Sequence, residues 1–80
     1  MNKVYVVEMY GYDEYERYGI FAKFEDAKKM LIEVYNKEKQ FYEDMYDDIY
    51  EVVFVSNDKF VLKFEGRIHN DYIIKEEKVQ

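Results

Sequence analysis

The chain has 80 residues, a formal net charge of −6 and no cysteine, and it holds ten tyrosines and six phenylalanines. The length predicts one domain, residues 1–80, with a small core, and the missing cysteines exclude disulfides and thiolate metal sites. The acidic charge argues against direct binding of DNA, RNA or an anionic membrane, because such binding depends on Lys and Arg. No apolar run approaches the roughly 20 residues of a membrane span, so we expect a soluble cytoplasmic protein.

Residue types that carry chemistry are scarce. The chain has one Ser, no Thr and one His, so we expect no enzymatic activity, and carboxylate pairs such as Asp13 and Glu16 lack any sign of an acid–base site. Acids of residues 44–51 would suit Mg²⁺ or Ca²⁺, but their spacing lacks the alternation and central Gly of a calcium loop. A lone His69 is a poor transition-metal site. We therefore expect no metal and no cofactor.

The N-terminal third predicts a hairpin. Residues 3–10 form a Val- and Tyr-rich strand, and residues 17–22 a second short one. Gly19 marks a bulge or a close backbone approach. Four tyrosines are expected to cluster at the end of the hairpin: Tyr10, Tyr12, Tyr15 and Tyr18.

A helix is predicted over residues 24–37, where the apolar stripe repeats at i, i+3, i+4 and i+7. Leu31 and Val34 lie at the centre of this stripe. No Gly or Pro separates the helix from residues 41–51, so one long helix is an alternative. The stripe lapses over Glu38, and we therefore prefer a break within residues 36–40.

The C-terminal part predicts more strands. Residues 52–56 and 60–64 are rich in β-branched and aromatic side chains and flank a two-residue turn at Asn57-Asp58. We expect a loop at residues 66–71, a last strand at 72–75 and a frayed tail at 76–80. The predicted fold class is α+β: an antiparallel sheet of four to five strands with one main helix packed on one face.

The N-terminal segments carry a family resemblance. Val4-Tyr5-Val6-Val7-Glu8, Gly19-Ile20-Phe21 and Glu25-Asp26-Ala27-Lys28 resemble segments of short uncharacterised bacterial and phage proteins with a β-β-α start. The resemblance covers about the first 35 residues and departs where Ala22 and Lys23 replace the usual Ser or Thr cap. It implies a phage origin, hence a host-cell cytoplasm, and brings no catalytic residue.

Residues 41–51 are the most unusual stretch. They hold five carboxylates and three tyrosines with no basic residue among them. If the stretch is helical, Phe41, Met45 and Ile49 form an apolar stripe beside a tyrosine stripe and an acidic face. With the hairpin end, it predicts a partner-binding surface made of Tyr42, Glu43, Asp44, Tyr46, Asp47, Asp48, Tyr50, Glu51, Tyr12, Asp13, Glu14 and Tyr15.

The partner that such a surface predicts is a basic protein. Carboxylates four residues apart on a helix are separated by about 6 Å along its axis, a spacing similar to that of phosphates. The narrower hypothesis is therefore a nucleic acid mimic, a phage-encoded inhibitor of a nucleic-acid-binding host defence protein such as a CRISPR effector. Two alternatives remain open: the acids only keep an aromatic domain soluble, or the tyrosines form the interface of a structural homodimer.

Overall fold

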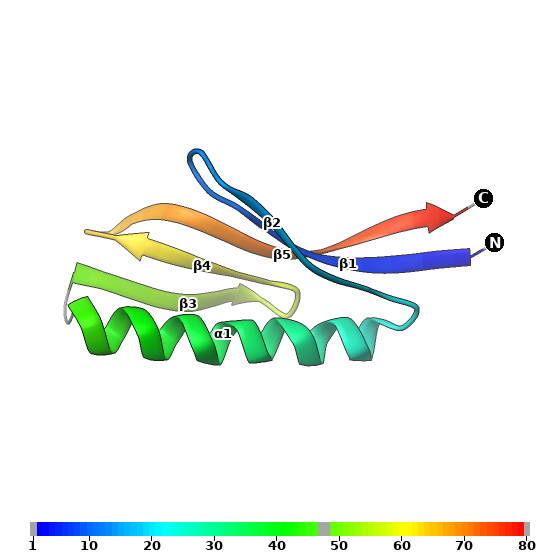
Figure 1. Ribbon diagram of the computed structural model, residues 1–80, viewed down its shortest axis with the longest axis horizontal. Coiled ribbons are helices and arrows are strands. Elements are labelled where there is room, and N and C mark those ends of the chain that lie inside the picture. The colour runs from blue at the N-terminus through cyan, green and yellow to red at the C-terminus, as the bar shows by residue number, and fades with distance from the viewer. Residues whose placement is uncertain (1, 47–48, 80) are drawn as a thin grey trace.

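The computed structural model describes residues 2–46 and 49–79, and one helix packs against a five-stranded antiparallel sheet in it (Figure 1). The sheet order is β2-β1-β5-β4-β3. This architecture confirms the predicted α+β class. The elements are β1 (Asn2–Tyr10), β2 (Tyr15–Phe21), α1 (Phe24–Tyr46), β3 (Tyr50–Ser56), β4 (Lys59–Phe64) and β5 (Arg67–Val79).

The β1–β2 hairpin is confirmed, including the irregularity at Gly19. The register shifts between Val7 and Glu8, so that Val7 faces Gly19 and Glu8 faces Arg17. One extra residue, Tyr18, therefore forms a β-bulge. A Cβ on Gly19 would lie 2.9 Å from the ring of Phe21, so a larger residue here would have to displace that ring.

The central strand is β5, which has 13 residues. It pairs with β4 over its first half and with β1 over its second half, from Phe64↔Arg67 to Asn2↔Val79. The loop predicted at residues 66–71 is thus wrong, and the tail predicted at 76–80 is strand as far as Val79. Both segments are polar, but a neighbouring strand supplies backbone hydrogen bonds to each, β4 to the first and β1 to the second.

The turns before β4 and β5 are tight. Asn57 and Asp58 form the predicted two-residue turn between β3 and β4. Glu65 and Gly66 connect β4 to β5 with φ angles of 51° and 80°, and positive φ at both positions is typical of a two-residue hairpin turn.

The helix α1 is continuous over 23 residues, so the break preferred within residues 36–40 is wrong. The buried stripe does not lapse at Glu38, because the Glu38 carboxylate accepts a hydrogen bond of 2.9 Å from the hydroxyl of the buried Tyr72. Tyr42 continues the stripe and packs against the core. A polar side chain can follow a buried stripe when a partner satisfies it.

The core lies between α1 and one face of the sheet. Ala27, Leu31 and Val34 of the helix are buried against strand residues that include Phe60 and Tyr72, whose rings stack with centroids 4.2 Å apart. In the part of the chain that the structure describes, no second layer covers the opposite face of the sheet. Within the same residues, no helix is both long enough and apolar enough to cross a membrane.

Candidate protein-binding surface

The acidic segment of residues 41–51 is divided between two elements. Glu43 and Asp44 lie in the last turns of α1, whereas Tyr50 and Glu51 begin β3. The three helical stripes expected across the whole segment are therefore wrong for Tyr50 and Glu51. Of the predicted site residues, Asp47 and Asp48 lie outside the described residues, as does the side chain of Tyr46.

Both parts of the segment border one hollow at this end of the molecule. Its volume is about 840 Å³, and Ile49, Tyr50 and Gly66 form part of its wall. Its carboxylates come from α1, β3 and the turn between β4 and β5; we call these four residues the acidic end: Glu43, Asp44, Glu51 and Glu65. Glu65 was not predicted, because its position depends on the pairing of β3 with β4, where the Glu65 N–H donates to the carbonyl of Ile49 at 3.0 Å.

The charges of the acidic end are unevenly compensated. The last turn of α1 contains no basic residue, so Glu43 and Asp44 lie where the helix dipole disfavours negative charge. Lys39 forms an i, i+4 ion pair with Glu43 at 2.9 Å. Glu51 faces Lys63 in the strand register. Asp44 and Glu65 make no ion pair with the described residues.

The aromatic residues near the acidic end are oriented differently from the stripes that the sequence predicted. Tyr42 and Tyr50 pack on each other with ring centroids 4.8 Å apart, and Tyr50 lies 5.1 Å from Phe64. Both tyrosines pack against the core, whereas Phe41 is half exposed. The predicted apolar stripe therefore faces outward at Phe41, and the tyrosine stripe faces inward at Tyr42.

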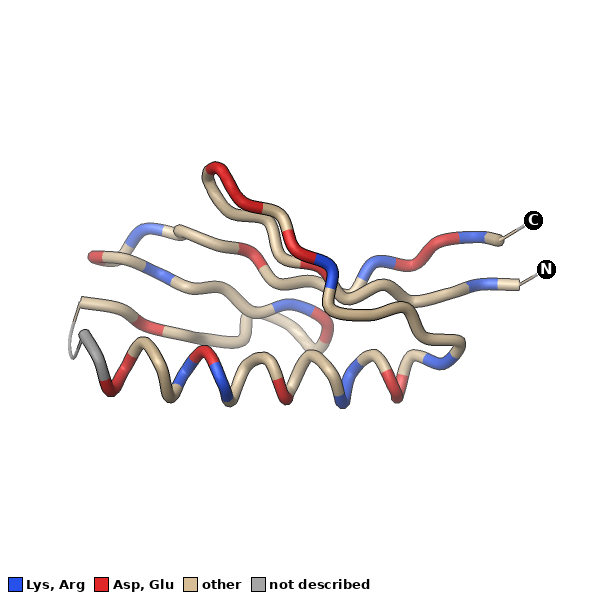
Figure 2. Tube along the Cα trace, in the orientation of Figure 1, with Lys and Arg blue, Asp and Glu red and all other residues tan. Residues whose placement is uncertain are grey.

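The hairpin tip forms a second acidic surface. Tyr12 is 90% exposed, and Asp13 and Glu14 are exposed beside it. The tip rises from the sheet on the side away from α1, and acidic residues mark both the tip and the C-terminal end of the helix (Figures 1 and 2). The structure therefore does not bring the two predicted groups of residues into one surface.

The predicted tyrosine cluster at the hairpin is split by the sheet. Tyr10 and Tyr15 pack together with ring centroids 5.2 Å apart on the face away from α1. Tyr18 lies on the helix side, where its ring stacks on Tyr72 at 6.4 Å. The bulge at Gly19 and the alternation of strand side chains account for this separation.

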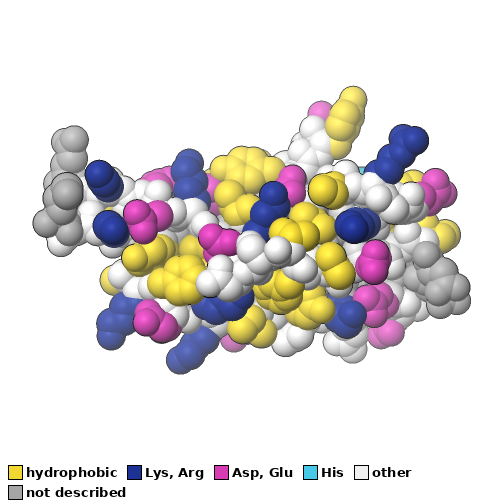
Figure 3. All heavy atoms as spheres, turned by 180° about the vertical axis from the view of Figure 1, so that it is seen from behind, with side chains coloured by type: hydrophobic (Ala, Val, Ile, Leu, Met, Phe, Trp, Pro, Cys, Tyr) yellow, Lys and Arg dark blue, Asp and Glu magenta, His cyan; other side chains and the backbone are white. Residues whose placement is uncertain are grey.

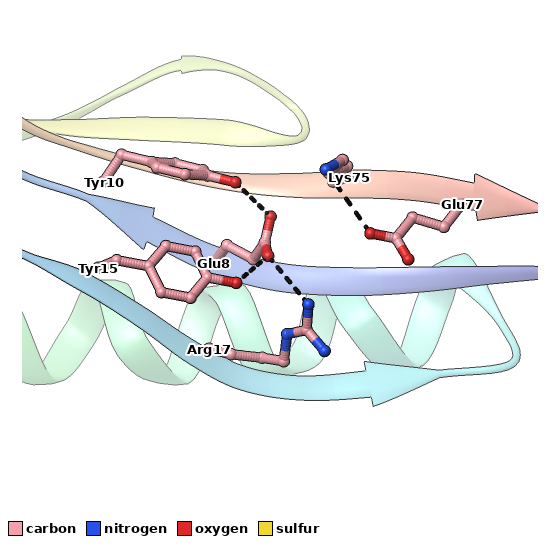
Figure 4. A network of polar contacts seen from close by, with 6 residues as sticks. All are labelled: Glu8, Tyr10, Tyr15, Arg17, Lys75 and Glu77. Carbon is pink, nitrogen blue, oxygen red and sulfur yellow. Dashed lines mark hydrogen bonds and ion pairs between the residues drawn. The ribbon is translucent and has the colours of Figure 1, made fainter.

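A buried carboxylate that the sequence analysis missed lies under the first pair. Glu8 is 2% exposed and accepts hydrogen bonds from the hydroxyls of Tyr10, at 2.8 Å, and Tyr15. Arg17 approaches it to 3.5 Å. Figure 4 shows both phenols and the guanidinium converging on the carboxylate, with the Lys75–Glu77 ion pair nearby. The signal in the sequence was one acid within an otherwise apolar strand.

The groups around Glu8 stabilise its charged form. Burial alone would raise the pKa of Glu8, but hydrogen bonds from Tyr15 and Tyr10 and the charges of Lys75 and Arg17 outweigh it and lower the pKa below its usual value. Glu8 is thus a fully satisfied carboxylate rather than a proton donor. Residues 2–46 and 49–79 contain no group of three His, Cys, Asp or Glu side chains placed to hold a metal ion.

Apolar and charged groups are mixed over the rest of the surface. Ile20, Val55 and Ile68, on three different strands, are each more than half exposed. From behind the view of Figure 1, apolar side chains gather across the middle of the molecule among Lys, Arg, Asp and Glu (Figure 3). Such a mixture is common to non-obligate interfaces and to protein surfaces in general, so it marks no particular site.

Comparison with known proteins adds no relative from which a role could be transferred. No protein-family model, no curated protein and no solved structure matches the chain. The functional argument therefore depends on the residues of this chain alone.

Proposed function

We propose that the protein is a small interaction module that binds a basic surface of another protein through its acidic end. The observation that carries the proposal is the hollow at the end of α1, bordered by four carboxylates from three segments and by the apolar side chains of Ile49 and Tyr50. A basic projection of a partner would meet both charge and apolar contact there.

The placement of the acids supports this role over mere solubility. A carboxylate in the last turn of a helix costs about 0.3–1 kcal/mol through the helix dipole. Solubility alone does not require negative charge at that position, since any exposed position would serve. Concentrated charge beside a hollow raises the rate at which an oppositely charged surface docks.

The proposal stops short of a phosphate mimic that inhibits a nucleic-acid-binding host protein. That narrower hypothesis used the four-residue spacing of carboxylates on one helix. Glu51 lies on β3 rather than on α1, so the described acids border a hollow instead of forming a row.

A charge-matched pair of variants tests the proposal. The acidic-end variant changes three exposed acids (Asp44→Asn, Glu51→Gln and Glu65→Gln), and the control variant changes three acids remote from the hollow (Asp26→Asn, Glu76→Gln and Glu77→Gln). Each immobilised protein is used to capture binders from a cell extract, which mass spectrometry then identifies. We expect a protein retained by the wild type and the control but lost from the acidic-end variant. Equal retention by all three proteins would show that the acidic end is not the binding surface.

A further inference from the structure

A second hollow lies between α1 and the edge strand β2. Its volume is about 570 Å³, within the range of ligand-binding clefts. β2 diverges from the helix toward the hairpin tip (Figure 1), which leaves this space open beside the sheet. We call it the Glu38 groove; its walls include Tyr18, Met30, Val34, Glu38, Phe41 and Tyr42.

The groove combines aromatic walls with negative charge. Glu16, Glu33 and Lys37 also line it, so the groove carries three glutamates and one lysine. Glu38 accepts a hydrogen bond from Tyr72 through its Oε2 atom and has no ion pair within residues 2–46 and 49–79. A partly buried carboxylate without a cation favours a cationic ligand.

A polar chain from the core fixes the position of this carboxylate. The side-chain amide of buried Asn70 lies 3.5 Å from the Tyr72 hydroxyl, which in turn donates to Glu38. Burial, opposed by the hydrogen bond from Asn70 and reinforced by the charge of Glu38, raises the pKa of Tyr72 far above its usual range. The phenol therefore keeps its proton as a donor, and Glu38 is held in a pre-organised position.

We propose that the Glu38 groove receives a lysine side chain of the basic partner. The ammonium pairs with the second oxygen of Glu38, while Tyr18, Phe41 and Tyr42 contact the methylene stem and supply cation–π attraction. Lysine is favoured over arginine because Tyr72 already occupies one carboxylate oxygen, and a guanidinium binds best to both. The inference rests on the proposed function and adds a specific subsite to it.

Side-chain analogues test the subsite without the partner. The probe is Nα-acetyl-lysine methylamide, which keeps its side-chain ammonium; it is titrated into isotope-labelled protein and followed by NMR. Its uncharged counterpart is Nα-acetyl-norleucine methylamide. We expect saturable shifts of Tyr18, Glu38 and Phe41 signals with the lysine probe and at least fivefold weaker binding of the norleucine probe. No saturable shift at these residues, or equal binding of both probes, would overturn the proposal. Tighter binding of N-acetyl-arginine methylamide would overturn the assignment to lysine.

Two variants locate the interaction. Glu38→Gln keeps an oxygen that can accept from Tyr72 but removes the charge, and it should weaken the lysine probe about tenfold, as loss of a charge-assisted hydrogen bond does. Phe41→Ala removes a half-exposed wall of the groove and should also weaken the probe. The acidic-end variant should bind the probe as the wild type does. If Glu38→Gln and Phe41→Ala both bind like the wild type, the subsite is wrong even where the acidic end still captures a partner.

Discussion

The packing of α1 predicts that truncating two neighbouring side chains of similar size, Leu31 and Ile32, destabilises the fold by very different amounts. Leu31 is fully buried in the core, whereas Ile32, the next residue of the same helix, is 41% exposed. Leu31→Ala removes three carbon atoms, worth about 0.8 kcal/mol each by transfer from water, and leaves a cavity. The expected loss is about 2.5–4 kcal/mol, a large share of the roughly 4–12 kcal/mol typical of a domain this size.

Urea unfolding followed by circular dichroism measures this difference. Leu31→Ala should lower the melting temperature by at least about 10 °C as well, since 1 kcal/mol corresponds to about 4–8 °C in small domains. Ile32→Ala should cost only about 1 kcal/mol, because its side chain is 41% exposed and its removal leaves no closed cavity. A cost below about 0.5 kcal/mol for Leu31→Ala, or equal costs for the two variants, would mean that the helix faces the sheet through a different side.

Three further predictions concern the hairpin and the helix. Because the pKa of Glu8 is lower in the folded chain, its charge stabilises the fold above the unfolded pKa and ceases to do so as pH falls through the folded pKa. The stability gap between wild type and Glu8→Gln should therefore be widest near neutral pH and shrink as pH falls below the usual range of a glutamate carboxyl, and a gap independent of pH would refute this. Amides of residues 36–40 should exchange slowly with deuterium in NMR, as in the rest of a continuous helix, whereas fast exchange confined to them would indicate a break. If the exposed hairpin tip forms a homodimer, Tyr12→Ala should convert a dimer to a monomer in analytical ultracentrifugation while leaving the Tyr15–Glu8 hydrogen bond in place, and a wild type that is monomeric at high concentration would eliminate that alternative.

The sequence predicted the structural elements that depend on residues close together in the chain. The stripe around Leu31 and Val34, the turn at Asn57-Asp58 and the bulge at Gly19 each depend on neighbouring residues, and the structure confirms them. β5 could not be predicted at its full length, because both its ends are polar and its second half pairs with β1, a strand distant in sequence. Propensity carries little information about such segments.

The same limit explains the errors at the candidate sites. The sequence pattern alone predicts that Glu38 interrupts the helical stripe, because its partner Tyr72 is 34 residues away in the chain. Glu65 lies at the acidic end because of the turn after β4, and Glu51 lies on β3 rather than on α1. In each case the strand pairing or packing around the carboxylate, rather than its residue type, determines where it lies.

The central claim is that the acidic end attracts a basic partner, and the association rate tests it most directly. Stopped-flow mixing with the captured partner, over about 0.05–0.5 M salt, compares the wild type with the acidic-end variant and the charge-matched control. We expect the wild type and the control to associate fast at low salt and to slow steeply as salt rises, and the variant to associate slowly with a flatter dependence. Identical rates and salt dependence for all three proteins would contradict the claim.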